Sequence, residues 1–187
     1  LVKNYPTTVA AIYHARAGHP YSWVYFADSN GDGFTFNDLL YVPSGPTDPK
    51  VRWTSIAERD AFFNFVSSSA LSKYAGSVAP RNSEVSPWTQ TLDLKLTQEI
   101  PMPGYNRVKF EAFANIINFG NLLNKKWGLI KEVPFSYKRA VAATTLDPAT
   151  NQYVYTFNSN TLNTVPTVAR DTPESRWQIQ LGAKVRF

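Results

Sequence analysis

The last twelve residues most constrain what this chain can fold into. From Arg176 to Phe187, apolar and polar side chains alternate without interruption. Because successive side chains of a β-strand point to opposite faces, this pattern predicts a strand with one apolar face and one polar, cationic face. A span of about 10 residues is also what a tilted strand needs to cross a bilayer. The predicted apolar face consists of Trp177, Ile179, Leu181, Ala183, Val185 and Phe187.

The same alternation recurs upstream at similar length. Thr7–Arg16 is predicted as a strand, and Trp88–Ile100 and Arg107–Ile116 are two more, joined by the tight turn Pro101–Gly104. Two long strands with a short turn predict an antiparallel hairpin. A further strand is expected over Trp127–Tyr137. A soluble β-sandwich alternates in the same way, but its strands are normally only about 5–6 residues long.

Two segments interrupt these strands. The first, about residues 28–86, contains an acidic loop and one helix, which begins at a capping box formed by Ser55 and Glu58. The second, about residues 138–174, is predicted as a long loop that carries a small hairpin. The apolar stripe expected on the helix consists of Ile56, Phe62, Phe63, Phe65 and Val66, and the hairpin is expected around Tyr153, Tyr155 and Phe157.

The acidic loop matches the first half of a calcium-binding loop. Ca²⁺ prefers about six to eight oxygen ligands, and carboxylate or amide oxygens at every second position can wrap around it. Leu39 stands where an EF-hand has its closing glutamate, so the loop is not an EF-hand. The other reading is a solvated turn rich in Asp, Asn and Gly. The candidate Ca²⁺ ligands are Asp28, Asn30, Asp32, the carbonyl of Phe34, and Asp38.

Composition excludes several other functions. The formal net charge is +5, but the basic residues are scattered, so we expect no nucleic-acid partner. The chain has no Cys, which excludes disulfides and thiolate metal sites, and no apolar run of about 18 residues, which excludes a membrane-spanning helix. The chain begins with Leu1 in what reads as mid-strand context, so we expect it to be a piece of a longer protein.

We do not expect an enzyme. The only histidines are His14 and His19, and no nucleophile motif is recognisable. His14 is interpreted as a lumen or core residue, and His19 lies in a predicted turn. Glu99 and Glu111 lie on adjacent predicted strands and could approach each other, but carboxylates facing a polar lumen explain them equally well.

Several short motifs, taken in order, resemble the carboxyl-terminal region of Oar-like TonB-dependent outer-membrane receptors. Each is weak alone, and together they cover most of the chain. They are Asp28–Gly33 with Asn37–Pro43, Ala79–Ser83, Pro87–Trp88 with Leu92–Leu94, Gln98–Pro101, Asn118–Asn124 with Trp127–Gly128, and the terminal Phe187.

The resemblance implies an all-β fold: antiparallel strands from the carboxyl-terminal portion of a transmembrane barrel of about 22 strands, with a small helical insert. It implies a Gram-negative outer membrane, and a transporter that uses energy from the TonB complex through a plug domain outside this chain to take up or export a large substrate. Its partners would be the remaining barrel, the plug and membrane lipid. Trp177, Ile179, Leu181, Val185 and Phe187 would then form the membrane-insertion strand and face lipid.

The resemblance also orients the chain. If Phe187 ends in the periplasm, the loop at about 138–174 is extracellular, and the Asn118–Asn124 turn is expected at the periplasmic end with Phe187. The alternative reading is a soluble, calcium-dependent β-sandwich that binds a carbohydrate or protein ligand. That alternative predicts that the chain folds in water without detergent.

Overall fold

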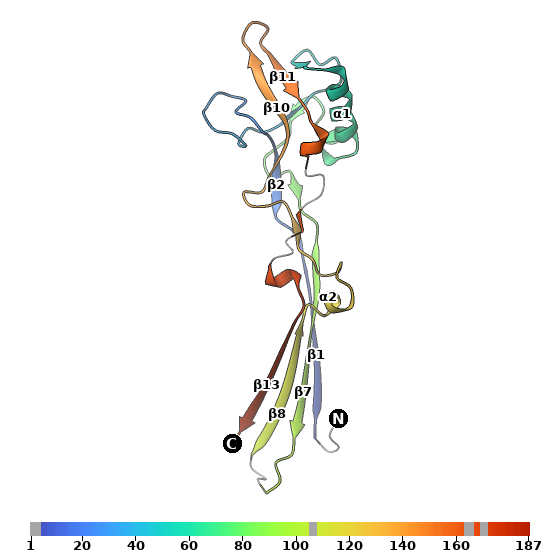
Figure 1. Ribbon diagram of the computed structural model, residues 1–187, viewed down its shortest axis with the longest axis vertical. Coiled ribbons are helices and arrows are strands. Elements are labelled where there is room, and N and C mark those ends of the chain that lie inside the picture. The colour runs from blue at the N-terminus through green and yellow to red at the C-terminus, as the bar shows by residue number, and fades with distance from the viewer. Residues whose placement is uncertain (1–4, 105–107, 163–166, 169–171) are drawn as a thin grey trace. The chain divides into compact units, whose positions relative to one another are not determined.

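A computed structural model describes residues 5–104, 108–162, 167–168 and 172–187 (Figure 1). The chain is mostly β-strand, with few helices. It divides into two compact units: unit 1 comprises Leu1–Gly18, Pro87–Lys131 and Val168–Phe187, and unit 2 comprises His19–Ser86 and Glu132–Thr167.

Thirteen strands, two α-helices and three 3-10 helices are found in the described residues. In chain order they are β1 Thr7–Arg16, β2 Pro20–Tyr25, β3 Tyr41–Val42, β4 Val51–Trp53, α1 Ile56–Ser67, η1 Ala70–Tyr74, β5 Ser77–Val78, β6 Glu84–Val85, β7 Thr89–Ile100, β8 Lys109–Ile117, α2 Phe119–Leu123, β9 Lys131–Glu132, β10 Lys138–Asp147, β11 Gln152–Thr156, η2 Ser159–Thr161, β12 Thr167–Val168, η3 Pro173–Ser175 and β13 Gln178–Arg186.

Unit 1 is built on a four-stranded sheet in the order β1-β7-β8-β13. Every neighbouring pair is antiparallel, and the strands run side by side in Figure 1. Within unit 1 the order along the chain is also the order in the sheet, which makes it an up-and-down meander. The predicted strand at Thr7–Arg16, the predicted hairpin and the predicted final strand are confirmed.

A short turn centred on Asn118 lies at one end of this sheet. Its backbone N–H donates to Asp93 Oδ1 at 2.7 Å, and its side-chain amide donates to the carbonyls of Gly128 at 3.0 Å and Glu174 at 3.2 Å. Gly128 is required here, because a Cβ at that position would lie 1.9 Å from Asn118 Oδ1. Among the residues of unit 1 that the structure describes, the buried ones are Thr89, Asn118, Asn121, Ile130 and Ser175.

The predicted strand over Trp127–Tyr137 is wrong, since only the two residues Lys131–Glu132 form β9 there. Gly128 has a positive φ of 62°, and the Ile130 N–H donates to the Ser175 hydroxyl at 3.1 Å rather than to a neighbouring strand. The segment therefore does not cross the sheet. Because Ile117 pairs with Gln178, the Asn118–Asn124 turn lies at the end of the sheet opposite Phe187, which corrects the expectation that the two share one end.

Unit 2 contains a five-stranded mixed sheet in the order β4-β11-β10-β2-β6. β10 and β11 form the antiparallel hairpin that the tyrosines predict, but β10 is a full 10 residues long. β2 pairs in parallel with β10, and β4 pairs in parallel with β11. β4 and β6 come from the segment predicted as a helical insert, and β10 and β11 come from the segment predicted as a long loop. Strands from both segments thus pair in one sheet.

The core of unit 2 is aromatic and lies between this sheet and α1. Ser55 caps the helix by accepting from the Glu58 N–H at 3.1 Å, as the capping box predicts. Phe62 packs against Trp53, Tyr155 and Phe157, with ring centroids 5.1, 5.9 and 5.4 Å away. The largest fully buried side chains of this core are Trp23, Tyr155, Phe62, Leu40, Leu71, Val42 and Val141.

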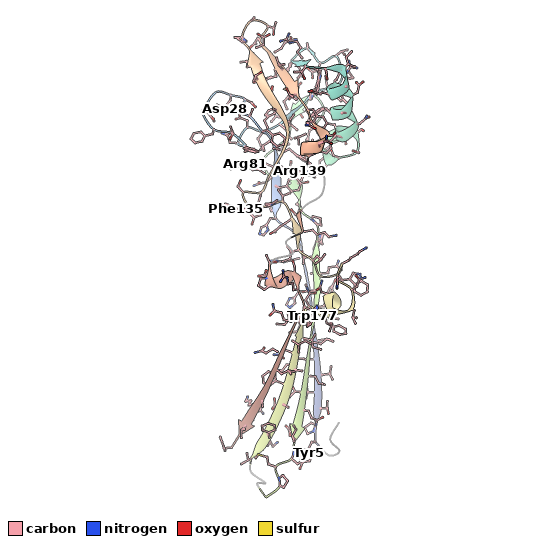
Figure 2. All side chains as sticks on the ribbon, in the orientation of Figure 1. Tyr5, Asp28, Arg81, Phe135, Arg139 and Trp177 are labelled. Atoms are coloured by element: carbon pink, nitrogen blue, oxygen red, sulfur yellow. The ribbon has the colours of Figure 1, made fainter. Side chains whose placement is uncertain are left out.

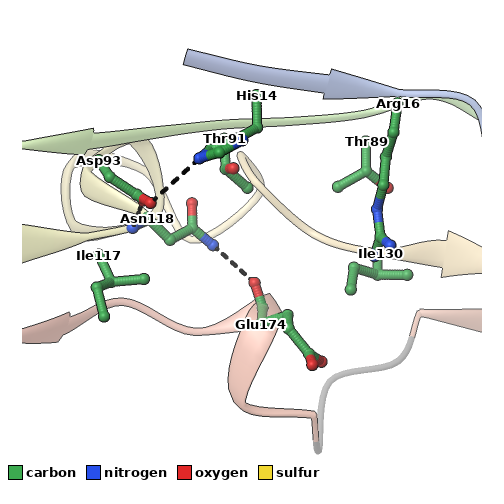
Figure 3. A pocket seen from close by; sticks show the side chains of 9 residues that line it. All are labelled: His14, Arg16, Thr89, Thr91, Asp93, Ile117, Asn118, Ile130 and Glu174. Atoms are coloured by element: carbon green, nitrogen blue, oxygen red, sulfur yellow. Dashed lines mark hydrogen bonds and ion pairs between the residues drawn. The ribbon is translucent and has the colours of Figure 1, made fainter. Parts of the chain in front are cut away.

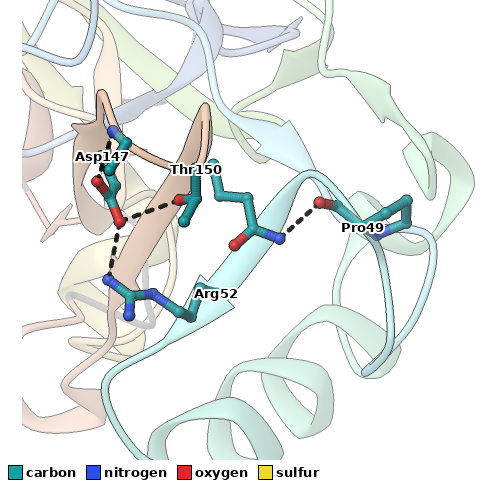
Figure 4. Close-up of polar contacts among 6 residues, drawn as sticks. Pro49, Arg52, Asp147 and Thr150 are labelled. Carbon is teal, nitrogen blue, oxygen red and sulfur yellow. Dashed lines mark hydrogen bonds and ion pairs between the residues drawn. The ribbon is translucent and has the colours of Figure 1, made fainter.

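Polar contacts hold the tip of the β10–β11 hairpin against β4 (Figure 4). Asp147 pairs with Arg52 at 3.2 Å and accepts from the Thr150 hydroxyl at 3.0 Å. Gln152 donates to the carbonyl of Pro49 at 2.9 Å. These contacts join segments about a hundred residues apart along the chain, so they fix the register of a long-range pairing.

Candidate functional site

The four-stranded sheet of unit 1 has two chemically different faces. On β13, Ile179, Leu181 and Val185 lie opposite Ile116, Ala114 and Phe110 of β8. Leu181 is 76% exposed although it is in the middle of its strand. Trp177 and Phe187, placed in the strand by the sequence, flank it instead (Trp177 is labelled in Figure 2), and both are exposed.

The opposite face is polar and internally paired. Arg186 pairs with Glu111 at 3.2 Å, and Lys109 lies 3.9 Å from Glu99. Glu99 and Glu111 are direct cross-strand partners, so the predicted approach of these carboxylates is confirmed. Like charges directly opposite each other destabilise a sheet, and here each carboxylate has its own cation.

One aromatic residue on the polar face has a packing role that the sequence analysis missed. Phe113 lies opposite Gly182, and a Cβ on that glycine would be 2.3 Å from the ring. The Lys95 ammonium lies 5.6 Å from the same ring centroid. The phenyl ring therefore covers the bare glycine backbone and is itself covered by a cation. The sequence signal for this contact is an aromatic residue at a position where the apolar–polar alternation of the strand predicts a polar one. In the sheet that residue lies opposite a glycine.

Exposed aromatic residues occur beyond both ends of the sheet. Trp88 and Trp177 directly precede β7 and β13, and Trp127 follows α2, at the end where Ile117 pairs with Gln178. Tyr5 and Phe187 flank the opposite end. Between these ends, β1 and β7 are paired along ten residues, or about 33 Å at the usual rise per residue.

Both edges of the sheet are open in the described part of the chain. β1 has only β7 as a neighbour, and β13 has only β8. Each edge is 9 or 10 residues long. A long edge with unpaired N–H and C=O groups is a template for another strand.

A polar cavity of about 350 Å³ lies on the polar face at the Asn118 end (Figure 3). His14 Nε2 is 3.7 Å from Asp93 Oδ2, while the other oxygen of Asp93 holds the Asn118 N–H. His14 is therefore on the polar face, as its reading as a lumen residue expects. The acidic group nearest to His14 is Asp93, which already accepts a hydrogen bond from the turn at Asn118. We therefore interpret the contact between His14 and Asp93 as structural.

In unit 2, carboxylates hold the acidic loop closed. Asp28 accepts from the backbone N–H groups of Gly31 at 2.7 Å, Asp32 at 3.2 Å and Gly33 at 2.8 Å. Asp38 accepts from the N–H groups of Ser29 at 2.6 Å and Asn30 at 3.3 Å. Such bonds are the turn chemistry expected of Asp- and Asn-rich loops.

The candidate Ca²⁺ ligands are close in sequence, and most of their oxygens face the loop backbone. Asp32 accepts from the Phe34 N–H at 2.9 Å, and this bond holds the pKa of Asp32 below its ordinary value. Within the described ranges, no group of three or more His, Cys, Asp or Glu residues is arranged to hold a metal ion. Ca²⁺ binding through Asp28, Asn30, Asp32, Phe34 and Asp38 stays a prediction.

His19, predicted in a turn, makes specific contacts in unit 2. Its Nδ1 is 2.8 Å from Glu132 Oε2, and its ring stacks on Tyr137 with centroids 4.6 Å apart. Its backbone carbonyl accepts from the Ser86 N–H at 3.0 Å. These contacts tie the segment after β9 to the start of β2.

None of the helices that the structure describes is long and apolar enough to cross a membrane. No protein-family model matches the chain, and neither a curated protein nor a solved structure was found to match it.

Proposed function

We propose that this chain is the carboxyl-terminal wall segment of an Oar-like, TonB-dependent transporter in the outer membrane of a Gram-negative bacterium. The observation that carries the proposal is the sheet of unit 1, on whose apolar face large side chains are exposed, with no core against it in the part of unit 1 that the structure describes. In water such a face is unfavourable, because each apolar Å² left exposed forgoes about 25 cal/mol of burial. Lipid chains would cover the face that includes Ile179, Leu181 and Val185.

The dimensions of the sheet support this proposal. Strands tilted by about 35–45° bring the paired length of β1 and β7 to about 25 Å across the membrane, which is the height of the apolar band of outer-membrane barrels. Trp88, Trp127 and Trp177 at one end, with Tyr5 and Phe187 at the other, would form the two aromatic girdles at the membrane interfaces.

The open edges define the partners. In lipid every backbone donor and acceptor must be paired, so a membrane sheet has to close. β1 and β13 would each pair with strands of the same barrel that lie outside this chain. A barrel of about 22 strands, with a plug that contacts the TonB complex, is the assembly that the family resemblance implies.

The strand register orients the proposed wall. Arg16, Thr89, Ile117 and Gln178 lie at the end of the sheet opposite Phe187. If Phe187 faces the periplasm, that end of the sheet faces the cell exterior, and the Pro101–Gly104 turn, at the Phe187 end, is periplasmic.

The alternative function is a soluble, calcium-dependent β-sandwich module that binds a carbohydrate or protein ligand. The aromatic core of unit 2 favours a water-soluble body there. The alternative leaves the exposed apolar face of unit 1 without an explanation. It predicts that the whole chain is monodisperse without detergent.

A pair of arginine substitutions tests the membrane proposal. On the lipid face near mid-membrane, Leu181→Arg should cost about 2–4 kcal/mol, whereas Gln180→Arg on the polar face should cost much less. Each variant is expressed in the full-length protein, and the fraction that is folded and detergent-extractable from outer membranes is measured. Equal tolerance of the two substitutions would refute the proposal, as would a native protein that needs no detergent and has an intact mass of 21.0 kDa.

A further inference from the structure

Unit 2 contains a cavity of about 300 Å³ that the membrane proposal does not use. Three tyrosine rings and a few polar side chains from distant parts of the chain form its lining, which we name the tyrosine pocket. Its defining residues are Tyr25, Tyr41, Tyr153, Asn30, Asp38 and Lys50. We propose that the tyrosine pocket binds a neutral saccharide ring. This proposal concerns unit 2 alone and does not depend on a membrane location for unit 1.

Tyr41 is held rigidly in the wall of this pocket. Its hydroxyl donates to Asp48 Oδ2 at 2.9 Å, its N–H donates to the Tyr25 hydroxyl at 3.1 Å, and its carbonyl accepts from the Tyr155 hydroxyl at 2.7 Å. The Tyr25 and Tyr155 hydroxyls are also hydrogen-bonded to each other. A ring fixed in this way loses little conformational freedom when a ligand stacks on it.

Lys50 and Tyr153 are fixed to the same framework. The Lys50 N–H donates to Asp48 Oδ1 at 2.9 Å, and the Tyr153 N–H donates to the Lys50 carbonyl at 2.9 Å. The Lys50 ammonium lies 5.1 Å from the centroid of the Tyr41 ring. One buried carboxylate, that of Asp48, thus organises both the tyrosine wall and the lysine beside it.

The acidic loop contributes polar groups to the lining. Asp38 Oδ2 accepts from the N–H groups of Ser29 and Asn30, which fixes these residues where they line the cavity. The second oxygen of Asp38 makes no hydrogen bond within the described residues and is left to accept from a ligand. The Tyr153 hydroxyl likewise has no partner in the described part of unit 2 and can donate or accept.

Charge and shape select the ligand class. The lining carries one cation and one anion: the Lys50 ammonium lies over a ring face, and Asp38 accepts from two amides. The pocket therefore offers no net charge to an ionic ligand. Aromatic walls with a few convergent polar groups suit a small molecule that has an apolar face and several hydroxyls. A volume at the lower end of the range of ligand sites, about 300 Å³, fits one ring.

Saturation-transfer NMR on the full chain in detergent tests this inference with glucose, galactose, xylose and N-acetylglucosamine as probes. At least one sugar should bind saturably. Tyr153→Ala should weaken that binding at least tenfold, and Lys50→Met should weaken it as well. Phe135→Ala is the matched control, because that ring is in the same unit, is 89% exposed and does not line the pocket.

The outcomes are distinct. The proposal is overturned if no sugar binds saturably, or if Tyr153→Ala and Phe135→Ala behave alike. Glycine is included as a zwitterionic probe, and binding of glycine in place of sugars with the same dependence on Lys50 would also overturn it. If Tyr153→Ala loses the near-UV circular dichroism of Trp23 and Trp53, the Lys50→Met result decides. Extraction from membranes is scored separately, so failure of the membrane proposal leaves this test intact.

Discussion

The two units differ in whether their large apolar side chains are buried or exposed. Unit 2 buries its large side chains in one cluster around Trp23, Phe62 and Tyr155. The sheet of unit 1 has longer, more regular strands, yet several of its large apolar side chains, such as Leu181, are on the surface. Regular strands and a buried core are thus separate properties: the sheet of unit 1 has the more regular strands, and unit 2 has the buried core.

The two units also obtain their stability from different sources. Unit 2 is stabilised from within by its packed rings and by the hydrogen bonds to the buried carboxylate of Asp48. The sheet of unit 1 has backbone pairing and cross-strand contacts, and a lone sheet of this kind gains little without a surface to pack on. Under the proposed function, lipid and neighbouring strands provide that surface.

The largest expected effect comes from truncating a ring of unit 2. Phe62→Ala should cost about 3–5 kcal/mol, because Phe62 is fully buried among four other rings. The comparison variant in unit 1 is Leu96→Ala, which removes fewer apolar atoms and does so at an exposed position of the sheet. Near-UV circular dichroism during denaturation in detergent measures the cost. Equal losses for both variants would contradict the contrast between the units.

The next largest effect is expected for a substitution at a glycine of unit 1. At this position the otherwise exposed sheet is closely packed. Gly182→Ala should cost about 1–3 kcal/mol, because the added Cβ overlaps the Phe113 ring at 2.3 Å. The double variant Gly182→Ala with Phe113→Ala removes the clash and should recover part of the loss. Hydrogen exchange of the β8 and β13 amides reports the result. If the single variant is as protected as the parent chain, the ring does not pack closely on the glycine.

The stability of unit 2 should also depend on acidic pH. Hydrogen bonds from the Ser44 and Lys50 amides and from the hydroxyls of Tyr41 and Ser44 outweigh the effect of burial and lower the pKa of Asp48 to about 2. A carboxyl group whose pKa is lower in the folded state contributes stability above its unfolded pKa, near 4, and loses it as the pH falls towards 2. The melting temperature of unit 2 should therefore fall between about pH 4 and pH 2, by roughly 4–8 °C for each kcal/mol by which the free energy of unfolding decreases.

Asp48→Asn tests this acid response. The variant should be less stable at pH 7 and should show a smaller fall between about pH 4 and pH 2, because the amide does not titrate there. Asp147→Asn is a control for a surface carboxylate in the same unit. An unchanged acid response in Asp48→Asn would assign the loss to other carboxylates.

The sequence predicts the strands of unit 1 well because their signal is local. Alternation over 9 to 12 residues fixes both the strand and its faces, as in Thr7–Arg16 and the final strand. Local capping chemistry likewise predicts the start of the helix at Ser55. Ile56, placed in the apolar stripe, is exposed, because the first residue of the helix precedes the part that packs on the sheet.

What the sequence does not predict depends on pairings between distant segments. β2 reads as a strand, but its parallel partner β10 begins more than a hundred residues later. The tyrosine pocket combines Tyr25, Tyr41 and Tyr153, which share no local pattern. The wrong strand over Trp127–Tyr137 has the opposite cause: its local composition suits a strand, but Gly128 and the bond from Ile130 to Ser175 redirect the backbone.

The smallest expected effect concerns the contact that ties the hairpin tip of unit 2 to β4. The Arg52 and Asp147 side chains are partly exposed, and pairs of this kind contribute about 0.2–1 kcal/mol. Arg52→Met keeps most of the side-chain length and should lower stability within that range, with a smaller loss at high salt because ions screen the pair. Asp147 retains its bond from Thr150, so the hairpin tip should stay folded. A loss as large as that of Phe62→Ala would mean that this ion pair, rather than the aromatic core, holds β4 and β11 together.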